Sequence, residues 1–317
     1  MYILGFDIGG TKCAAITAKW DGENISIEKR EACNTDLSVS AHTMIGRLIG
    51  MADSILRKKP DRIGISCGGP LDSERGIIMS PPNLPGWSNI EITEILERHY
   101  GVSAYLQNDA NASALAEWKF GAGRGSGNMV FLTFGTGMGA GLILGGRLYE
   151  GTNGNAGEVG HIRLEKDGPV GFGKRGSFEG FCSGGGIAQL AKSAADEALA
   201  HGIRPSYLDC NEISARTVAE AARGGDPTAL SVYAEVGKRL GRGLSLLIDI
   251  LNPEKIVIGS IFERSGDLLT EHMQRELCSE ALKESADVCT VLPAALGDLI
   301  GDHAAIAAAV YEGGDRK

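Results

Sequence analysis

Two glycine-rich turns, each placed between short apolar segments, constrain this sequence more than any other feature. The first is GGTK at 9–12 and the second is GTGMG at 135–139, and each is followed by a strand-like segment, 13–17 and 141–144. Because glycine lacks a β-carbon, such turns bring several backbone N–H groups close to an anion such as a phosphate. A Walker loop or a dinucleotide fingerprint would instead run into a helix. The pair therefore predicts two phosphate-holding hairpins across a cleft and a duplicated core, although either turn alone could be an ordinary hairpin.

The rest of the chain alternates strand-like and helix-like patterns, which is typical of an α/β fold. Further strands are predicted at 62–66, 103–106 and 255–259. Helices are predicted at 41–57, 90–100, 110–120, 184–200, 215–223, 226–251 and 266–284. Ser88 or Asn89 is expected to cap the helix at 90–100. Since no linker rich in Pro and Ser separates the halves, the duplication itself places a domain boundary near residue 110.

Composition narrows the class of protein. The 317 residues include 31 Lys or Arg and 40 Asp or Glu, a net charge of −9, which argues against a partner that is a nucleic acid. Apolar residues make up 43% and aromatic residues 6%, so the core is expected to be aliphatic. The seven cysteines form no CxxC pair, as in reduced cytosolic proteins. With neither a signal peptide nor a long apolar run, the protein is expected to be cytoplasmic, with no membrane partner.

Five motifs, in order along the chain, resemble those of the ROK family of sugar kinases and repressors. They are DIGGTK at 7–12, NDANASALAEW at 108–118, FGTGMGAG at 134–141, GEVGH at 157–161 and IVIGS at 256–260. The resemblance implies an α/β fold of the actin/hexokinase-like (ribonuclease H-like) type, with two lobes, a duplicated βαβ core and an interlobe cleft. The smaller N-terminal lobe would be 1–109, completed by a C-terminal helix at 303–317, and the larger lobe would be 110–302.

Some members of this family are regulators with a DNA-binding domain ahead of the first motif. Here that motif begins at residue 7, which leaves no room for such a domain, so the kinase branch is expected. The resemblance then implies ATP and Mg²⁺ as cofactors, and a homodimer or homotetramer.

A sugar hydroxyl is a poor nucleophile near neutral pH, so a sugar kinase needs a carboxylate that accepts its proton. Asp109 stands at the junction of a predicted strand and a predicted helix and matches the family's catalytic base. On its own, an aspartate at this place could equally be a helix cap.

The nucleotide site is expected around the glycine-rich turns. Asp7 precedes the first turn and would act on Mg²⁺ directly or through water; alternatively it caps the turn. The resemblance assigns phosphate contacts to Gly9, Gly10, Thr11, Lys12, Thr136 and Gly137. It assigns the adenosine contact to Gly259, where Ser260 replaces a second glycine that is common in the family.

Sugar specificity requires convergent polar groups, because a sugar offers many hydroxyls and little apolar area. The positions that match the family's sugar contacts are Asn83, Asn108, Asp109, Glu158, His161 and Glu179, with backbone approach at Gly68 and Gly69. Without its GEVGH context, His161 would be read as a structural histidine.

One departure from the family concerns metal binding. The family usually carries CxCGxxGCxE after GH, and its three cysteines and a histidine bind zinc. Here Val170, Phe172 and Ser177 stand at the cysteine positions. Two apolar side chains cannot ligate zinc, and Cys182 with His161 are too few ligands for a closed site. No zinc site is therefore expected.

The expected activity is ATP-dependent phosphorylation of a hexose at its 6-hydroxyl, with glucose the first candidate. Allose, mannose, fructose and N-acetylmannosamine remain alternative substrates, since the contacts are shared among them. A sugar-binding regulator without catalysis is an alternative of another class. An NAD-dependent oxidoreductase is disfavoured, because a strand follows the second turn.

Overall fold

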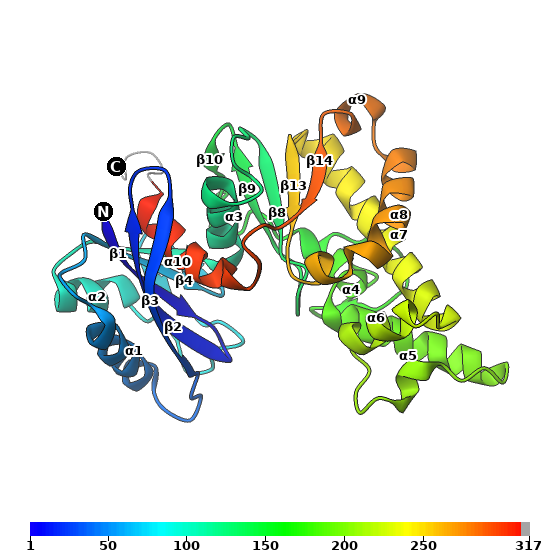
Figure 1. Ribbon diagram of the computed structural model, residues 1–317, viewed down its shortest axis with the longest axis horizontal. Coiled ribbons are helices and arrows are strands. Elements are labelled where there is room, and N and C mark those ends of the chain that lie inside the picture. The colour runs from blue at the N-terminus through cyan, green and yellow to red at the C-terminus, as the bar shows by residue number, and fades with distance from the viewer. Residues whose placement is uncertain (312–317) are drawn as a thin grey trace. The chain divides into compact units, whose positions relative to one another are not determined.

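The computed structural model describes residues 1–311, which fall into two compact units (Figure 1). Unit 1 comprises Met1–Gly127, Gly141–Ala156 and the chain from Ala295 on, and unit 2 comprises Asn128–Ala140 and Gly157–Ala294. The lobes expected from the sequence, 1–109 with 303–317 and 110–302, stay a prediction, and residues 312–317 of the expected last helix lie outside the described part. None of the helices within residues 1–311 is both long and apolar enough to cross a membrane.

The first five-stranded sheet lies in unit 1 and has the order β3-β2-β1-β4-β7. Its strands are β1 (Tyr2–Ile8), β2 (Lys12–Trp20), β3 (Ile25–Asn34), β4 (Arg62–Cys67) and β7 (Ala104–Asn108). β1, β4 and β7 run parallel, and Ile8, Cys67 and Asn108 pair in one row. Because these three residues end their strands, the loops that follow all leave the sheet at the same edge.

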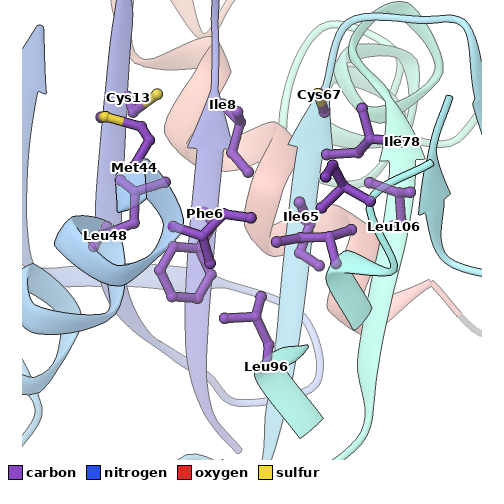
Figure 2. Packing of buried hydrophobic residues seen from close by; sticks show 14 of the residues in the cluster. Phe6, Ile8, Cys13, Met44, Leu48, Ile65, Cys67, Ile78, Leu96 and Leu106 are labelled. Atoms are coloured by element: carbon purple, nitrogen blue, oxygen red, sulfur yellow. The ribbon is translucent and has the colours of Figure 1, made fainter. Parts of the chain in front are cut away.

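One face of this sheet carries the main core of unit 1. Phe6, Ile65 and Leu106 point from the strands toward α1 (Ala41–Ile55) and α2 (Ile92–Tyr100) (Figure 2). The side chains in this layer are aliphatic or sulfur-containing apart from a few aromatic rings, as the composition predicted. This packing fixes the strands whose ends carry the candidate site.

The other face of the sheet is covered by α10 (Ile300–Val310), which is rich in alanine. A β-carbon at Gly64 of β4 would lie 1.9 Å from the carbonyl oxygen of Ala305, so only glycine permits this close helix-to-sheet contact. Beside α10 packs α3 (Asp109–Phe120), whose Glu117 side chain is fully buried. Glu117 accepts hydrogen bonds from the backbone N–H groups of Ala122, Ala295 and Leu296.

The second five-stranded sheet has the order β10-β9-β8-β13-β14. Its strands are β8 (Met129–Leu132), β9 (Ala140–Leu144), β10 (Arg147–Leu148), β13 (Lys255–Ile258) and β14 (Thr290–Pro293). β8, β13 and β14 are parallel, and β9 and β10 form an antiparallel hairpin. The order repeats that of the first sheet, which agrees with the duplicated core predicted from the two turns.

The remaining elements are helices of unit 2 and short hairpins. The helices are α4 (Phe178–Phe181), α5 (Gly184–Ala200), α6 (Ala215–Arg223), α7 (Pro227–Leu251), α8 (Ile261–Glu280) and α9 (Lys283–Ala286). The single-turn helices are η1 (Val159–His161), η2 (Ser206–Asp209) and, in unit 1, η3 (Gly297–Leu299). The hairpins pair β5 (Leu71–Asp72) with β6 (Ile77–Ile78) and β11 (Val170–Gly171) with β12 (Lys174–Arg175).

Two sequence predictions about helix starts are wrong. α2 starts at Ile92 with Glu91 as its N-cap, not Ser88 or Asn89. Asn89 has a φ of +53°, Ile90 forms a β-bridge with Ile78, and the two N–H groups donate to the carbonyls of Met79 and Ile78. The helix expected at 266–284 begins earlier, at Ile261, and ends at Glu280, with a kink at Ser265.

Candidate active site

The first glycine-rich turn is fixed by hydrogen bonds at its base. Gly9 N–H donates to the Lys12 carbonyl oxygen at 3.0 Å. Thr35, just after β3, donates its hydroxyl to the Gly9 carbonyl at 2.6 Å and its N–H to the Thr11 carbonyl at 2.9 Å. Thr11 and Lys12 themselves are exposed. Hydrogen bonds to Thr35 and within the turn therefore fix its backbone, while the side chains of Thr11 and Lys12 are accessible to a ligand.

Four further predicted residues gather beside this turn in unit 1. A β-carbon at Gly10 would lie 2.4 Å from the Asn83 carbonyl oxygen, so the turn and the Asn83 loop are in close contact. The amide nitrogen of the Asn83 side chain lies 3.3 Å from the β-carbon position of Gly68. That of Asn108 lies 3.1 Å from the corresponding position of Gly69. The loops after β1 and β4, the segment after β6 and the end of β7 therefore bring these polar groups close together.

Asp109 is the first residue of α3. Asn108 occupies the N-cap position, and its side-chain oxygen accepts from Ala110 N–H at 3.0 Å. An Asp109 carboxylate oxygen accepts from the same N–H at 2.8 Å. The residue as a whole is exposed, but the protein around its carboxyl group removes hydration and raises its pKa, against the opposing effect of the Ala110 N–H.

Asp7, near the end of β1, is partly buried among other acids. Burial raises its pKa to about 6, and the nearby charges of Asp302 and Asp109 add to this shift. The positive charge of Arg30 on β3 opposes this shift. Arg30 Nε also donates to both carboxylate oxygens of Asp302, at 2.9 and 2.8 Å. The ion pair between Arg30 of β3 and Asp302 of α10 therefore lies close enough to Asp7 to affect its pKa.

The carboxylates of Asp7 and Asp109 are hard oxygen ligands of the kind that Mg²⁺ prefers. Within residues 1–311, no group of three or more His, Cys, Asp or Glu side chains is arranged to hold a metal ion. Mg²⁺ is usually held by one or two carboxylates together with substrate phosphates. This part of the chain fits that kind of shared binding.

The second glycine-rich turn, in unit 2, closes on itself. Thr133 donates its N–H to the Gly139 carbonyl at 3.0 Å, and its hydroxyl accepts from Gly139 N–H at 2.9 Å. The Gly135 carbonyl accepts from Gly184 N–H at 2.8 Å, so the start of α5 lies against the turn. This contact was not predicted from the sequence. The three glycines at 184–186 were the available signal, since helix N-termini offer N–H groups to anions.

Glu179 of α4 joins the second turn to a predicted sugar contact. One of its carboxylate oxygens accepts from Met138 N–H at 3.0 Å. The same oxygen would lie 2.8 Å from a β-carbon at Gly137. The structure therefore brings Gly137 and Glu179 together, with Thr136 exposed beside them.

Glu158 precedes η1 as its N-cap, His161 is the last residue of η1, and both are exposed. The His161 ring meets Phe172 edge to face, with ring centroids 5.3 Å apart. The Lys174 ammonium group donates to the His161 carbonyl oxygen. The β11–β12 hairpin that carries Phe172 and Lys174 thus holds the end of η1.

The three positions where the family usually has cysteines make other contacts here. The N–H and carbonyl of Val170 both bond to the Gln189 side chain, at 2.9 and 3.0 Å. Phe172 is 73% exposed, and the buried Ser177 hydroxyl caps α4 by accepting from Gly180 N–H at 3.1 Å. Cys182 is buried, with its sulfur 3.8 Å from the Val236 carbonyl oxygen.

Gly259 and Ser260 follow β13 in unit 2. Gly259 is buried and donates its N–H to the Leu132 carbonyl at 3.0 Å. Ser260 has φ of +61°, a conformation that favours glycine. A 2.6 Å hydrogen bond from Ser260 N–H to Glu263 supports it. At Ser260, therefore, the backbone has a conformation that glycine adopts more readily than serine.

The sequence matches a known protein family and several of its characterised members. A model described as "ROK family" matches residues 3–310. The chain belongs to the ROK family. A glucokinase of Halalkalibacterium halodurans is 34% identical over 312 residues, which cover 95% of this chain and 92% of that protein. A xylose repressor of Caldicellulosiruptor bescii is 28% identical over 282 residues, which cover 86% of this chain and 69% of the repressor. This ROK protein therefore resembles both a kinase and a repressor.

A solved ROK structure confirms the fold. The ROK family glucokinase of Streptomyces griseus, in complex with glucose and AMPPNP, is 29% identical. It matches with a TM-score of 0.76 over 98% of both chains. The actin/hexokinase-like α/β fold expected from the five motifs is thereby confirmed for this ROK chain.

Proposed function

We propose that this protein is an ATP-dependent kinase that phosphorylates a hexose at its 6-hydroxyl, with glucose as the first substrate. The observation that carries the proposal is the place of Asp109. Its carboxylate stands at the start of α3, at the same sheet edge as the first glycine-rich turn and close enough to Asp7 to raise the pKa of that acid. A base beside a phosphate-binding turn is the arrangement that phosphoryl transfer to a hydroxyl requires.

In the proposed reaction, Asp109 accepts the proton of the sugar 6-hydroxyl as that oxygen bonds to the γ-phosphorus of ATP. A raised pKa makes the carboxylate a stronger base than an ordinary aspartate. Mg²⁺, when bound, neutralises charge on the phosphates, and Asp7 would hold it through water. Contacts to the phosphates are assigned to Gly9, Gly10, Thr11, Lys12, Thr136 and Gly137, and the adenosine contact to Gly259.

Sugar binding is proposed for polar groups with exposed or half-exposed side chains. These are Asn83, Asn108, Asp109, Glu158, His161 and Glu179, with backbone groups of Gly68 and Gly69. Their carboxylate and amide oxygens accept from sugar hydroxyls, while amide and imidazole N–H groups donate. Loss of one such partner leaves the others unpaired, which is how a site of this kind rejects a sugar that lacks one hydroxyl.

A regulator that binds sugar without catalysis is the second candidate, because a xylose repressor is among the relatives. The net charge of −9 argues against binding to nucleic acid. We also propose that the protein acts in the cytoplasm, as a homodimer or homotetramer.

The decisive experiment measures ADP formation with ATP, Mg²⁺ and a panel of glucose, allose, mannose, fructose and N-acetylmannosamine. A kinase releases ADP only with an accepted sugar, and NMR of the product should show phosphate on the 6-oxygen. Asp109→Asn is the matched control. Sugar binding by calorimetry with no sugar-dependent ADP release would contradict the kinase and favour the regulator.

A further inference from the structure

Glu150 lies in unit 1, in the segment after β10, outside every predicted site position. One of its carboxylate oxygens accepts two hydrogen bonds, from the Ser73 hydroxyl at 2.9 Å and from the side-chain amide nitrogen of Gln107 at 3.1 Å. A carboxylate can only accept, so the NH₂ end of the Gln107 amide faces Glu150. The amide oxygen of Gln107 must then point the other way.

That oxygen faces the junction between β7 and α3. It accepts from the backbone N–H of Asn108 at 2.8 Å and from the Asn111 side chain at 3.4 Å. Gln107 and Asn111 are 7% and 3% exposed, so water competes little for these bonds. β7 is the last strand of its sheet among the described strands, and the Gln107 side chain supplies an acceptor where a further strand would have done so.

We propose that Glu150 is a positioning residue for Asp109 and acts through Gln107. The inference rests on the proposed function, since it assigns a helper to the proposed base. Gln107 bonds to the residue directly before Asp109, and Asn111 follows two residues after it. A network that holds the backbone N–H of Asn108 before the base and the side chain of Asn111 after it restricts where the Asp109 carboxylate points. Displacement of a reacting group by about 1 Å costs roughly 100-fold in rate, so loss of these hydrogen bonds should lower kcat.

Four variants test the inference by steady-state kinetics with the accepted sugar. Glu150→Ala should lower kcat about tenfold and leave the KM for sugar within about twofold, because the chemical step suffers more than binding. Glu150→Gln keeps an acceptor oxygen for Gln107 and should retain kcat within about threefold. Ser73→Ala removes the other partner of Glu150 and should change kcat by less than about twofold. Gln107→Leu should lower kcat at least as much as Glu150→Ala.

The double variant Gln107→Leu with Glu150→Ala distinguishes positioning from a general effect. If Glu150 acts through Gln107, the second substitution should add less than about a twofold loss, since residues of one network are not additive. Independent of turnover, amide hydrogen exchange at residues 107–111 should speed up in Glu150→Ala.

The outcomes are separable from those of the proposed function. A wild-type protein that phosphorylates no sugar would refute the kinase, and the exchange measurement would still report on the network. With an active wild type, the inference fails if Glu150→Ala keeps kcat within about twofold, or if the two substitutions multiply their separate losses. Slower turnover with unchanged exchange at 107–111 would also overturn it.

Discussion

The two glycine-rich turns share a pattern but differ in their neighbours. Two residues before the first glycine stands Asp7 in one turn and Thr133 in the other. Asp7 lies among the charges of Asp109 and Asp302, whereas the Thr133 hydroxyl is satisfied by the turn itself. The second turn has an acid nearby, Glu179, but its carboxylate is bonded to a backbone N–H. The two copies of the hairpin therefore differ in charge. The first has neighbouring carboxylates whose charges interact, and in the second the nearby polar side chains are hydrogen-bonded to the turn's own backbone.

This difference divides the expected effects of substitution. Changes near the first turn should alter the chemical step and the response to pH. Changes near the second turn should alter the affinity for substrates.

The largest effect is expected for Asp109→Asn. The amide cannot accept the hydroxyl proton, so kcat should fall by about two to four orders of magnitude. Sugar binding should stay within about threefold, because the side chain keeps its shape. Kinetics and calorimetry on the same preparation check both. Near-normal turnover in the folded variant would remove Asp109 from the role of base.

Asp7→Asn should stabilise the protein in the absence of Mg²⁺ and lower kcat less than Asp109→Asn does. The pKa of Asp7 rises from 3.8 to about 6 on folding, so the folded state holds the proton more tightly. Raising the pH from about 4 to about 6 therefore costs the wild type stability, and the loss is complete above that range. The shift corresponds to an upper limit of about 3 kcal/mol.

Thermal unfolding at several pH values measures this effect. The variant should melt above the wild type at pH 8, and the difference should shrink toward pH 4. Asp196→Asn, on the exposed surface of α5, serves as the control. A variant less stable than the wild type at pH 8 would contradict the charge argument.

Gly137→Ala should act mainly on affinity. The new β-carbon would lie 2.8 Å from the Glu179 carboxylate, which forces that side chain away from Met138 N–H. The KM for ATP and for sugar should rise about tenfold, while kcat falls less than about threefold. Gly46→Ala in α1 has open space for a β-carbon and should change neither. If Gly137→Ala lowered kcat as much as Asp109→Asn does, the proposed division between a first turn that affects the chemical step and a second turn that affects affinity would be wrong.

The smallest effect is expected from metal chelation. Hydrogen bonds and caps hold the segment that bears Glu158, His161 and Glu179. Activity and melting temperature should therefore survive a strong chelator once Mg²⁺ is resupplied, and elemental analysis should find no stoichiometric zinc. About one zinc per chain, in protein purified without added metal, would be the contrary result.

The sequence predicted the parts of the molecule that depend on local pattern. Both turns, the strands that end at them and the helices α5 and α6 agree with the structure, because glycine punctuation and apolar periodicity act over a few residues. The actin/hexokinase-like fold was predicted from the five family motifs, not from local pattern. The placement of Asn108 as the cap of α3 could also be read from the sequence once the helix start was known.

Contacts between distant segments were not predictable in this way. β3 was missed, because its exposed side chains give no apolar run. The bond of Arg30 to Asp302 joins residues far apart in the chain, and neither residue belongs to a motif. Gln107 and Glu150 look like ordinary polar surface residues in the sequence. Such pairs exist only because the sheet order brings their strands and loops together.

The fit of α10 against β1 and β4 has a consequence for biosynthesis. Ribosomes make β1 first, yet the sheet that contains it is covered on one face by a helix made nearly a whole chain later. Until residues 300–310 leave the ribosome, Gly5 and Gly64 lack their contacts with α10, and the apolar sheet face that α10 covers is exposed to water. Unit 2 lies between the two halves of this pairing and has all of its residues by Ala294. Unit 1 is therefore begun first and completed last during synthesis. In that interval its exposed strands are available to chaperones that bind such strands.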